Sequence, residues 1–389
     1  MTFSSKFAIA LSLPALALAS CGNAQTGDSA DGSGAAADYS VETMGVFEEP
    51  WAIEFAPGTG VMFITEKAGV LKIMDTNTGE IGVVTGAPEV AYGGQGGFGD
   101  IAFLASEADQ ELTGRTIYLS WAEAGEGEGD DQTRGAVLGK GTLDCSATDA
   151  CSVKGLEVIW RQAPKVTGRG HYSHRIEVSP DGQYLFVASG DRQKQDPAQD
   201  KTNTIGSMVR LNLDGTPATG NPFADEGGVT GEIWSYGHRN ILGMDFDAEG
   251  RLWEIEHGPA GGDELNLVER AANYGWPTRS NGDNYNGVDI PDHTEDDGFT
   301  KPAIHWTPVI APGDMIIYSG DMFEAWKGSA LIAGLASEAL VRVSINGETA
   351  SEEERMEIGG RLRSIEQGPD GAIWVAEDGD KGRLLKLSM

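Results

Sequence analysis

The sequence is short of cysteine and of positive charge. It holds three cysteines, and 28 lysine and arginine residues stand against 60 aspartate and glutamate residues, which gives a formal net charge of −32. Proteins bind the phosphate backbone of nucleic acids through positive charge, so this balance excludes nucleic acid as a partner. Most of the carboxylates are interpreted as a solvated surface. Ca²⁺, which prefers oxygen ligands, is the cation they would suit.

Motifs of several common enzyme classes are also missing. The chain contains no H-E-x-x-H, no cysteine cluster and no G-x-S-x-G, which argues against zinc-hydrolase and serine-hydrolase sites. Residues 94–99 match G-x-G-x-x-G, but the apolar run that follows is typical of a strand and not of the helix that a dinucleotide site requires. Amphipathic helices longer than three turns are not expected anywhere in the chain.

The N-terminus has the pattern of an export signal. Residues 1–20 combine Lys6 with an apolar run over 7–18 that is too short to span a membrane, as in a signal peptide. The sequence Leu-Ala-Ser-Cys ending at Cys21 resembles a lipobox, so we predict a lipidated Cys21 as the mature N-terminus. Ordinary cleavage near Ala24 is the alternative.

Residues 21–38 are rich in Gly, Ser, Ala and Asp and are predicted to be a flexible tether. Gly22 after the modified cysteine is typical of outer-membrane sorting. We therefore expect a periplasmic protein that is anchored at the outer membrane only through its lipid. In that oxidising compartment Cys145 and Cys151 are predicted to form a disulfide, with a pair of free thiols as the alternative.

One pattern recurs from Tyr39 to the C-terminus. A turn that contains glycine precedes a short apolar strand, and a second strand usually follows. The six turn glycines are Gly60, Gly114, Gly182, Gly250, Gly328 and Gly371. Repeated units that cannot bury both faces alone favour radial repetition. The sequence therefore predicts an all-β protein, a six-bladed β-propeller over residues 39–389. Its first strand, from about Val41, would complete the blade that the last strand ends.

Four loops hold the polar residues that could form a site. They carry Gln95 in GGQGG, His171 in GRGHYSHRI, Arg239 in SYGHRN, and the pair Arg361 and Arg363 in RLRS. The two arginines are two residues apart and so lie on one face of a strand. Paired guanidinium groups suit an anionic ligand, although neutralising a neighbouring acid is the simpler alternative.

These motifs resemble the soluble PQQ-dependent sugar dehydrogenases of the glucose/sorbosone dehydrogenase family. The resemblance runs from about Glu49 to the C-terminus, and its most specific part is EHGPAGGDELN…NYGWP over 256–277. It implies oxidation of aldose sugars at C1 to lactones, with transfer of a hydride to the quinone of PQQ.

The resemblance also assigns the catalytic roles. His171 matches the general base that takes the proton of the C1 hydroxyl, and Asp191 matches the carboxylate that orients it. Arg239 matches the group that stabilises charge on the quinone oxygen. The other five histidines are interpreted as structural: His174, His238, His257, His293 and His305.

The cofactor residues implied by the resemblance form two sets. The PQQ contacts are Gln95, Arg239, Asn240, Tyr285, Asn286, Arg361 and Arg363. The Ca²⁺ ligands are the carbonyl oxygens of Gly258 and Pro259 at the cofactor, and Glu264 with Tyr274 at a second ion. The segment 279–300 is expected to form a wall of the site.

Two positions depart from the family pattern. Ser337 stands at about the place of a lysine that contacts PQQ, and His174 stands where glycine is common and would narrow the sugar pocket. Two other functions therefore stay open. One is a Ca²⁺-dependent lactonase-type propeller hydrolase, and the other is a non-catalytic propeller that binds glycans or proteins. The electron acceptor and the oligomeric state are not predicted.

Overall fold

The structure is a computed structural model that describes residues 39–389. The predicted signal peptide, Cys21 and the predicted tether lie outside the described residues. No helix within 39–389 is long and apolar enough to cross a membrane. The short 3-10 helices are η1 (Ala105–Glu107), η2 (Gly129–Asp131), η3 (Asp196–Gln199), η4 (Ala224–Glu226), η5 (Gly228–Glu232) and η6 (Glu324–Trp326).

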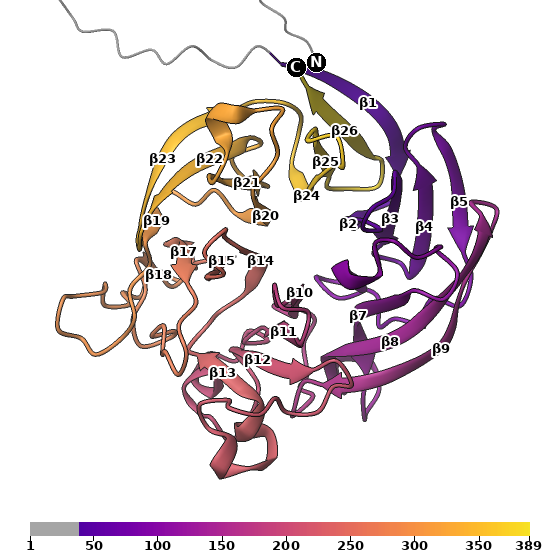
Figure 1. Ribbon diagram of the computed structural model, residues 1–389. Coiled ribbons are helices and arrows are strands. Elements are labelled where there is room, and N and C mark those ends of the chain that lie inside the picture. Colours follow the sequence, from indigo (N-terminus) through magenta and orange to yellow (C-terminus); the bar gives the residue numbers. More distant parts are fainter. Residues whose placement is uncertain (1–38) are drawn as a thin grey trace, which may run out of the picture. The chain divides into compact units, whose positions relative to one another are not determined.

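Six four-stranded antiparallel sheets make up the rest of the fold, and Figure 1 shows them as blades around a central axis. Blade 1 contains β2 (Pro50–Phe55), β3 (Val61–Glu66), β4 (Val70–Asp75) and β5 (Glu80–Val84). Blade 2 contains β6 (Phe98–Phe103), β7 (Thr116–Ala124), β8 (Arg134–Ala147) and β9 (Ala150–Arg161). Blade 3 contains β10 (Ser173–Val178), β11 (Tyr184–Ser189), β12 (Ser207–Asn212) and β13 (Ile233–Tyr236).

The second half of the chain repeats this arrangement. Blade 4 contains β14 (Ile241–Phe246), β15 (Leu252–Glu256), β17 (Asp263–Leu267) and β19 (Ile304–Trp306), with the short pair β16 (Ala260–Gly261) and β18 (Gly282–Asp283) beside it. Blade 5 contains β20 (Pro312–Ile317), β21 (Ala330–Gly334), β22 (Leu340–Asn346) and β23 (Thr349–Met356). Blade 6 contains β24 (Leu362–Gln367), β25 (Ile373–Glu377), β26 (Gly382–Ser388) and β1 (Ser40–Phe47).

The ring closes as the sequence predicts. Strand β1 pairs antiparallel with β26, from Val41 opposite Leu387 to Phe47 opposite Gly382. The first strand of the described chain thus completes the last blade, and the prediction of a six-bladed β-propeller is confirmed. The first turn differs in detail, because Gly58 and not Gly60 has the positive φ of 74°.

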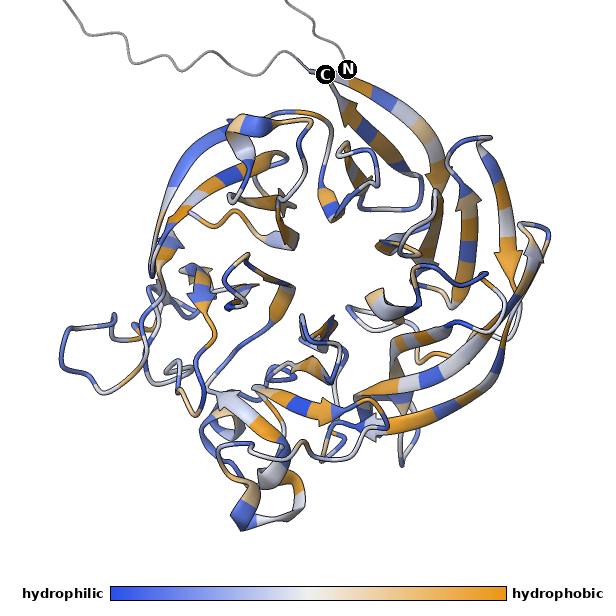
Figure 2. Cartoon of the chain, viewed as in Figure 1, coloured by the Kyte–Doolittle hydropathy of each residue, from blue (hydrophilic) through white to orange (hydrophobic). Residues whose placement is uncertain are grey.

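Hydrophobic faces of neighbouring blades form the core. One cluster joins blade 1 to blade 2 through Phe63, Ile73, Leu119 and Val137, all of them buried. Burying such a side chain contributes about 1.5–3 kcal/mol relative to leaving it exposed. Toward the outside the pattern becomes alternating, and Figure 2 shows hydrophobic and hydrophilic bands in turn along the outer strands.

The predicted disulfide lies on two of these outer strands. Cys145 on β8 and Cys151 on β9 are paired across the ladder and are bonded through their sulfur atoms. The prediction of a Cys145–Cys151 disulfide is confirmed in the structure.

The innermost strands, β2, β6, β10, β14, β20 and β24, stand side by side around the axis. Predicted site residues lie just before several of these strands: Gln95 before β6, His171 before β10, Asn240 before β14 and Arg361 before β24. Loops at one mouth of the propeller therefore bring together residues that are far apart in sequence.

Candidate active site

The centre of the site is a buried pair formed by His171 and Asp191. His171 Nδ1 lies 2.6 Å from Asp191 Oδ1, and we assign the proton to Nδ1 because the carboxylate can only accept. Burial, assisted by the charge of Arg239, outweighs this hydrogen bond and lowers the pKa of His171 below its usual 6.5. The imidazole is therefore neutral near pH 7, and its Nε2 is able to accept a proton.

The pKa of Asp191 moves in the direction that this role needs. Burial would raise it, but the hydrogen bond and electrostatic attraction of the His171 ring, together with the charge of Arg239, outweigh burial, so the pKa of Asp191 is lowered. An ionised Asp191 holds the ring of His171 and stabilises the imidazolium that forms when the ring takes a proton.

The loop that carries His171 has a strained backbone. The φ angles are 46° at His171, 55° at Ser173 and 51° at His174, and such values cost non-glycine residues about 1–3 kcal/mol each. Two neighbouring loops hold this conformation. His171 N–H donates to Gln95 Oε1 at 2.6 Å, and Ser173 N–H donates to Asn240 Oδ1 at 3.3 Å. Gln95 and Asn240 thus position the predicted base.

Arg239 and Trp276 enclose the pair. Asp191 N–H donates to the Arg239 carbonyl oxygen at 2.8 Å, and Trp276 Nε1–H donates to Asp191 Oδ2 at 2.7 Å. The Arg239 guanidinium lies over the Trp276 ring and donates from Nη1 to the His257 carbonyl oxygen at 3.0 Å. Its buried Nε has no hydrogen-bond partner among residues 39–389. This unpaired donor suits an anionic oxygen.

Strand β15 fixes the start of β14. Glu256 Oε2 accepts the backbone N–H of Arg239 at 2.6 Å and that of Asn240 at 3.1 Å. Because one buried carboxylate holds both peptide groups, the two side chains leave the backbone in fixed directions.

A cavity of about 320 Å³ opens at the same mouth. Its polar lining includes Gln95, Ser173, His174, Asn240, Arg361, Arg363 and Asp378. His171 borders this cavity through Gln95 and the adjacent Tyr172, which both line it.

Arg361 and Arg363 share one carboxylate at the wall of this cavity. Arg361 donates twice to Asp378 Oδ2, both at 3.1 Å, and Arg363 donates twice to Asp378 Oδ1, at 3.1 and 3.0 Å. The two guanidinium groups therefore lie on one face, as their spacing predicts. They do neutralise an acid, but two positive charges meet a single carboxylate. The group keeps a net positive charge, which suits an anionic ligand.

Three predicted cofactor residues do not line this cavity: Arg239, which lines the small space beside Gly258, and Tyr285 and Asn286. Tyr285 is 76% exposed and meets the site at Arg239, whose Nη2 donates to its hydroxyl at 3.3 Å and whose guanidinium lies 5.8 Å from its ring centroid. Asn286 is at the tip of the next turn, where its Oδ1 accepts the N–H of Val288 at 3.0 Å. The structure thus does not bring Asn286 to the cavity, because the turn directs it outward. The segment 279–300 reaches the site through Tyr285.

The two departures from the family pattern differ in position. His174 forms part of the cavity wall, with its ring 4.8 Å from that of Trp51, and burial lowers its pKa to about 3. It is a neutral, bulky wall residue. Ser337 does not line this cavity, and its buried Oγ has no hydrogen-bond partner among residues 39–389.

The predicted metal ligands gather beside β15 and β17. Gly258, Glu264 and Tyr274 line a space of about 10 Å³, and Pro259 follows directly. The Tyr274 hydroxyl donates a hydrogen bond to the Leu267 carbonyl oxygen at 2.5 Å. The carbonyl oxygens of Gly258 and Tyr274 accept no hydrogen bond from the described residues. Free carbonyl oxygens and a buried carboxylate are donors of the kind that Ca²⁺ takes.

Sequence reasoning missed three contributors. Trp276 is interpreted from sequence as a core residue, yet its N–H orients Asp191. Asp378 receives no role, although its place directly after β25 puts it beside Arg361. His238 is interpreted as structural, but the structure places it against two buried glutamates. Only the three-dimensional pairing shows these contacts.

Comparison with known proteins places the chain in a family. The family model described as Glucose / Sorbosone dehydrogenase matches residues 47–386. The chain is 36% identical over 346 residues to the aldose sugar dehydrogenase YliI of Escherichia coli (strain K12), which covers 88% of this chain and 90% of that protein.

Solved structures show the same fold. The crystal structure of the soluble aldose sugar dehydrogenase of Escherichia coli in the apo-form has a TM-score of 0.82 and 34% identity, and covers 90% of this chain and 99% of that chain. The PQQ-bound form of an aldose sugar dehydrogenase from Streptomyces coelicolor has a TM-score of 0.71 and 25% identity, and covers 91% of this chain and 99% of that chain. The chain therefore belongs to the glucose/sorbosone dehydrogenase family.

Proposed function

We propose that this protein oxidises aldose sugars at C1 to lactones, with PQQ as its cofactor and Ca²⁺ as its metal. Membership of the family and similarity to aldose sugar dehydrogenases support a sugar dehydrogenase. The similar protein with PQQ bound supports the cofactor. The observation that carries the proposal is the buried His171–Asp191 pair beside Arg239, next to a cavity with two more arginines.

The residues present fit PQQ. The cofactor is planar and carries carboxylates and quinone oxygens. The buried Arg239 Nε has no partner within the described chain, and Arg361 and Arg363 together keep a net positive charge. These arginines would hold the anionic groups, with Gln95 and Asn240 as further polar contacts. When bound, PQQ would supply the quinone that accepts the hydride from the sugar.

The fit to Ca²⁺ rests on oxygen donors. Gly258 and Pro259 would offer carbonyl oxygens at the cofactor, and Glu264 with the Tyr274 carbonyl oxygen would hold a second ion. Ca²⁺ bound there would act as a Lewis acid and as a template.

The protein's own residues handle the proton. Neutral His171 accepts the proton of the sugar C1 hydroxyl at Nε2, and ionised Asp191 stabilises the resulting imidazolium. Trp276 holds Asp191 in place through its N–H. Arg239 places positive charge where negative charge develops on an oxygen. The strained loop around His171 keeps this arrangement fixed before substrate arrives.

A reconstitution assay tests this function. With PQQ and Ca²⁺ added, the full chain should reduce an artificial dye when given glucose or another aldose. The absorbance spectrum of the protein with PQQ should change on addition of the sugar. Absence of turnover across a panel of aldoses, with PQQ bound, would contradict the proposal.

One observation favours a second candidate, the lactonase-type hydrolase. Six carboxylates face the channel at its other end, where an axial cation of such an enzyme would lie. Hydrolysis of a lactone in the absence of PQQ would support this function, and failure to hydrolyse a lactone panel with Ca²⁺ present would remove it.

We also propose that the protein is periplasmic and held at the outer membrane by a lipid on Cys21. The lipobox sequence supports this location. Cell fractionation tests it: the wild type should remain with outer membranes, and a Cys21→Ser variant should not. Equal distribution of the two proteins would contradict the anchor.

A further inference from the structure

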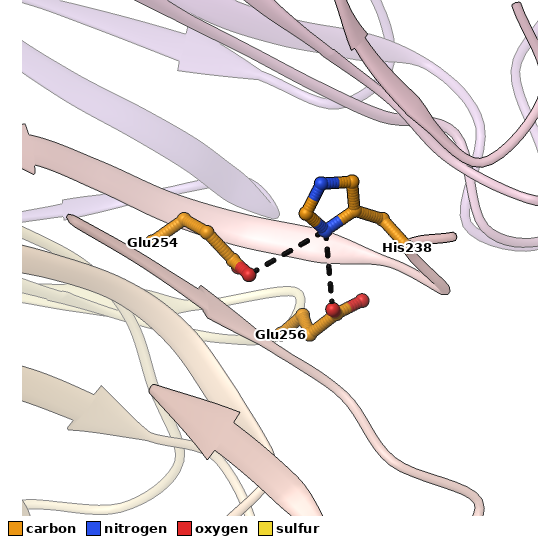
Figure 3. A group of neighbouring side chains, drawn as sticks. All are labelled: His238, Glu254 and Glu256. Atoms are coloured by element: carbon orange, nitrogen blue, oxygen red, sulfur yellow. Dashed lines mark hydrogen bonds and ion pairs between the residues drawn. The ribbon is translucent and has the colours of Figure 1, made fainter. Parts of the chain in front are cut away.

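A buried group of one imidazole and two carboxylates lies where the loop before β14 meets β15. Figure 3 shows His238, which precedes β14, facing Glu254 and Glu256 from β15. The three side chains are 0%, 0% and 4% exposed. His238 Nδ1 lies 3.6 Å from Glu254 Oε1 and 3.3 Å from Glu256 Oε1. None of the three groups acts on the sugar in the proposed reaction.

The spacing is longer than in the His171–Asp191 pair. The same atom types in His171 and Asp191 are 2.6 Å apart, and charge-assisted hydrogen bonds are usually about 2.7–2.9 Å long. Two atoms bound to one metal at about 2.0–2.2 Å in tetrahedral geometry are separated by about 3.3–3.6 Å. The 3.3 Å contact to Glu256 is a long hydrogen bond without an ion, and both distances from His238 Nδ1 also equal those between ligands of one ion.

Two oxygen atoms beside the group have no partner. Glu254 Oε2 and Asn266 Oδ1 are buried and accept no hydrogen bond among residues 39–389, and both residues are 0% exposed. Asn266 belongs to the group, because its Nδ2 donates to Glu254 Oε1 at 2.8 Å. Buried oxygens are normally paired, so two unpaired ones at one place point to a cation.

The charge balance points the same way. Glu264 stands opposite Glu256 on the paired strand β17, so three carboxylates share this interior. Within the described chain their one ion-pair partner is His238, which contacts Glu254 and Glu256. The Ca²⁺ proposed at Glu264 would balance that carboxylate, which leaves Glu254 and Glu256 with His238 as their one ionic partner among residues 39–389.

The second ring nitrogen of His238 is also arranged as in metal sites. Nε2 lies 2.8 Å from Ser235 Oγ, and the ring stacks on Tyr274 with centroids 4.5 Å apart. A histidine that binds a metal usually donates its other N–H to an oxygen, which fixes the ring and exposes a lone pair to the ion. We assign the proton to Nε2, since Ser235 Oγ can accept it, and this tautomer has its lone pair on Nδ1.

We propose that His238, Glu254 and Glu256 bind a divalent first-row transition-metal ion, with Zn²⁺ as its probe. An imidazole ligand favours such an ion over Ca²⁺ or Mg²⁺. Asn266 lies beside Glu254, and its unpaired Oδ1 is the candidate for a fourth ligand of a closed structural site. Since the other oxygen of Glu256 holds the N–H groups of Arg239 and Asn240, the ion braces the start of β14. The site does not depend on PQQ.

Metal binding by the full chain tests the proposal without cofactor or sugar. Protein stripped with a chelator is equilibrated with Zn²⁺ and a chromophoric competitor. The expected result is about one Zn²⁺ per chain. His238→Gln and Glu254→Gln should each weaken binding by more than about 10-fold. His293→Gln removes a histidine that also faces a carboxylate, Asp297, and should leave zinc binding unchanged.

Three results would overturn the site. They are absence of retained Zn²⁺, equal affinity in the wild type and both variants, and displacement of Zn²⁺ by an equal concentration of Ca²⁺. Should the variants fail to fold, anomalous diffraction of wild-type crystals at the zinc edge decides. A peak among His238, Glu254 and Glu256 supports the site, and its absence there contradicts it.

Discussion

The two ends of the propeller channel have opposite chemistry. At the end where the innermost strands begin, the site gathers His171, Arg239, Arg361 and Arg363. At the other end, a cavity of about 300 Å³ is lined by one carboxylate from each innermost strand. We call this set the carboxylate ring: Glu54, Asp100, Glu177, Asp245, Asp314 and Glu366.

The same strands build both ends. On β10, His174 lines the first cavity and Glu177 lines the second. Arg175 lies between them and is the one basic residue that lines the second cavity, bound to Asp100 at 3.0 Å and to Asp314 at 3.2 Å. Because all six innermost strands start at the same mouth, a residue's place along its strand decides which of the two cavities its side chain lines.

The two environments move ionisable groups in different directions. At the ring, burial and then neighbouring carboxylates raise the pKa of Glu54 well above its usual range. Burial raises the pKa of Asp245 to about 7 and that of Asp314 to about 6. At the active site, the pKa values of His171 and Asp191 are both lowered. One end therefore retains protons, and the other holds a base ready to accept one.

The largest expected effect is on turnover. His171→Ala should lower the rate of sugar oxidation by about 10²-fold or more while PQQ stays bound, because the general base is lost. The matched change at the other end, Glu177→Gln, should leave the rate within about twofold, since its carboxyl does not touch the first cavity. Steady-state kinetics with a dye acceptor measure both. Similar rates for the two variants would remove the functional difference between the ends.

The pH profile sharpens the same comparison. A base with a lowered pKa remains deprotonated below its usual value, so wild-type kcat/KM should hold its plateau through pH 6.5 and decline only at more acidic pH. A decline that begins well above pH 6.5 would contradict the role of His171.

Cofactor binding gives the next largest effect. Arg363→Ala should weaken PQQ binding by about 10-fold or more, because charge-assisted hydrogen bonds at the cavity are lost. A titration followed by PQQ absorbance measures the Kd. Arg342→Ala is the matched control, since Arg342 binds Glu354 on outer strands away from the cavity. Equal Kd values for the two variants would exclude the arginine clamp.

The smallest effect is on stability. The carboxyl groups of the carboxylate ring have raised pKa values in the folded protein. Their contribution to the free energy of unfolding is therefore fully present below the usual carboxyl pKa near 4 and is lost as pH rises through about 7. Glu366→Gln removes one of the repelling groups. Its Tm should therefore exceed that of the wild type by about 2 °C at pH 8, with little difference at pH 4.

Calorimetry in a chelating buffer measures this shift, and Glu42→Gln on the exposed face of β1 serves as the control. If the Tm of the wild type rises relative to that of Glu366→Gln between pH 4 and pH 8, the carboxylate ring is not a source of repulsion.

Much of the fold was predictable because it depends on local pattern. Turn glycines such as Gly182 and Gly250, each followed by an apolar strand, indicate one blade per copy, and both adopt positive φ. The pairing of Cys145 with Cys151 follows from their proximity in sequence and from the predicted compartment. The site was predictable in part, since His171 and Asp191 lie in motifs that resemble a known family.

Other site features had no local signal. Nothing near Trp276 in the sequence indicates a hydrogen bond to Asp191, and nothing near Asp378 indicates two arginine partners. The carboxylate ring could not be predicted from local sequence either, because its members are spread over six blades. The PQQ contact of Asn286 stays a prediction, since its Oδ1 holds the N–H of Val288 within its own exposed turn.

The sequence by itself determined the strands, the turns and the number of blades, because alternation of apolar residues and placement of glycine act over a few residues. Only the tertiary structure decided which charges meet. Closure of the propeller brings residues from separate blades within hydrogen-bonding distance, and burial and charged neighbours then set their pKa values. Electrostatic neighbours across a closed ring depend on position in space, which no short stretch of chain encodes.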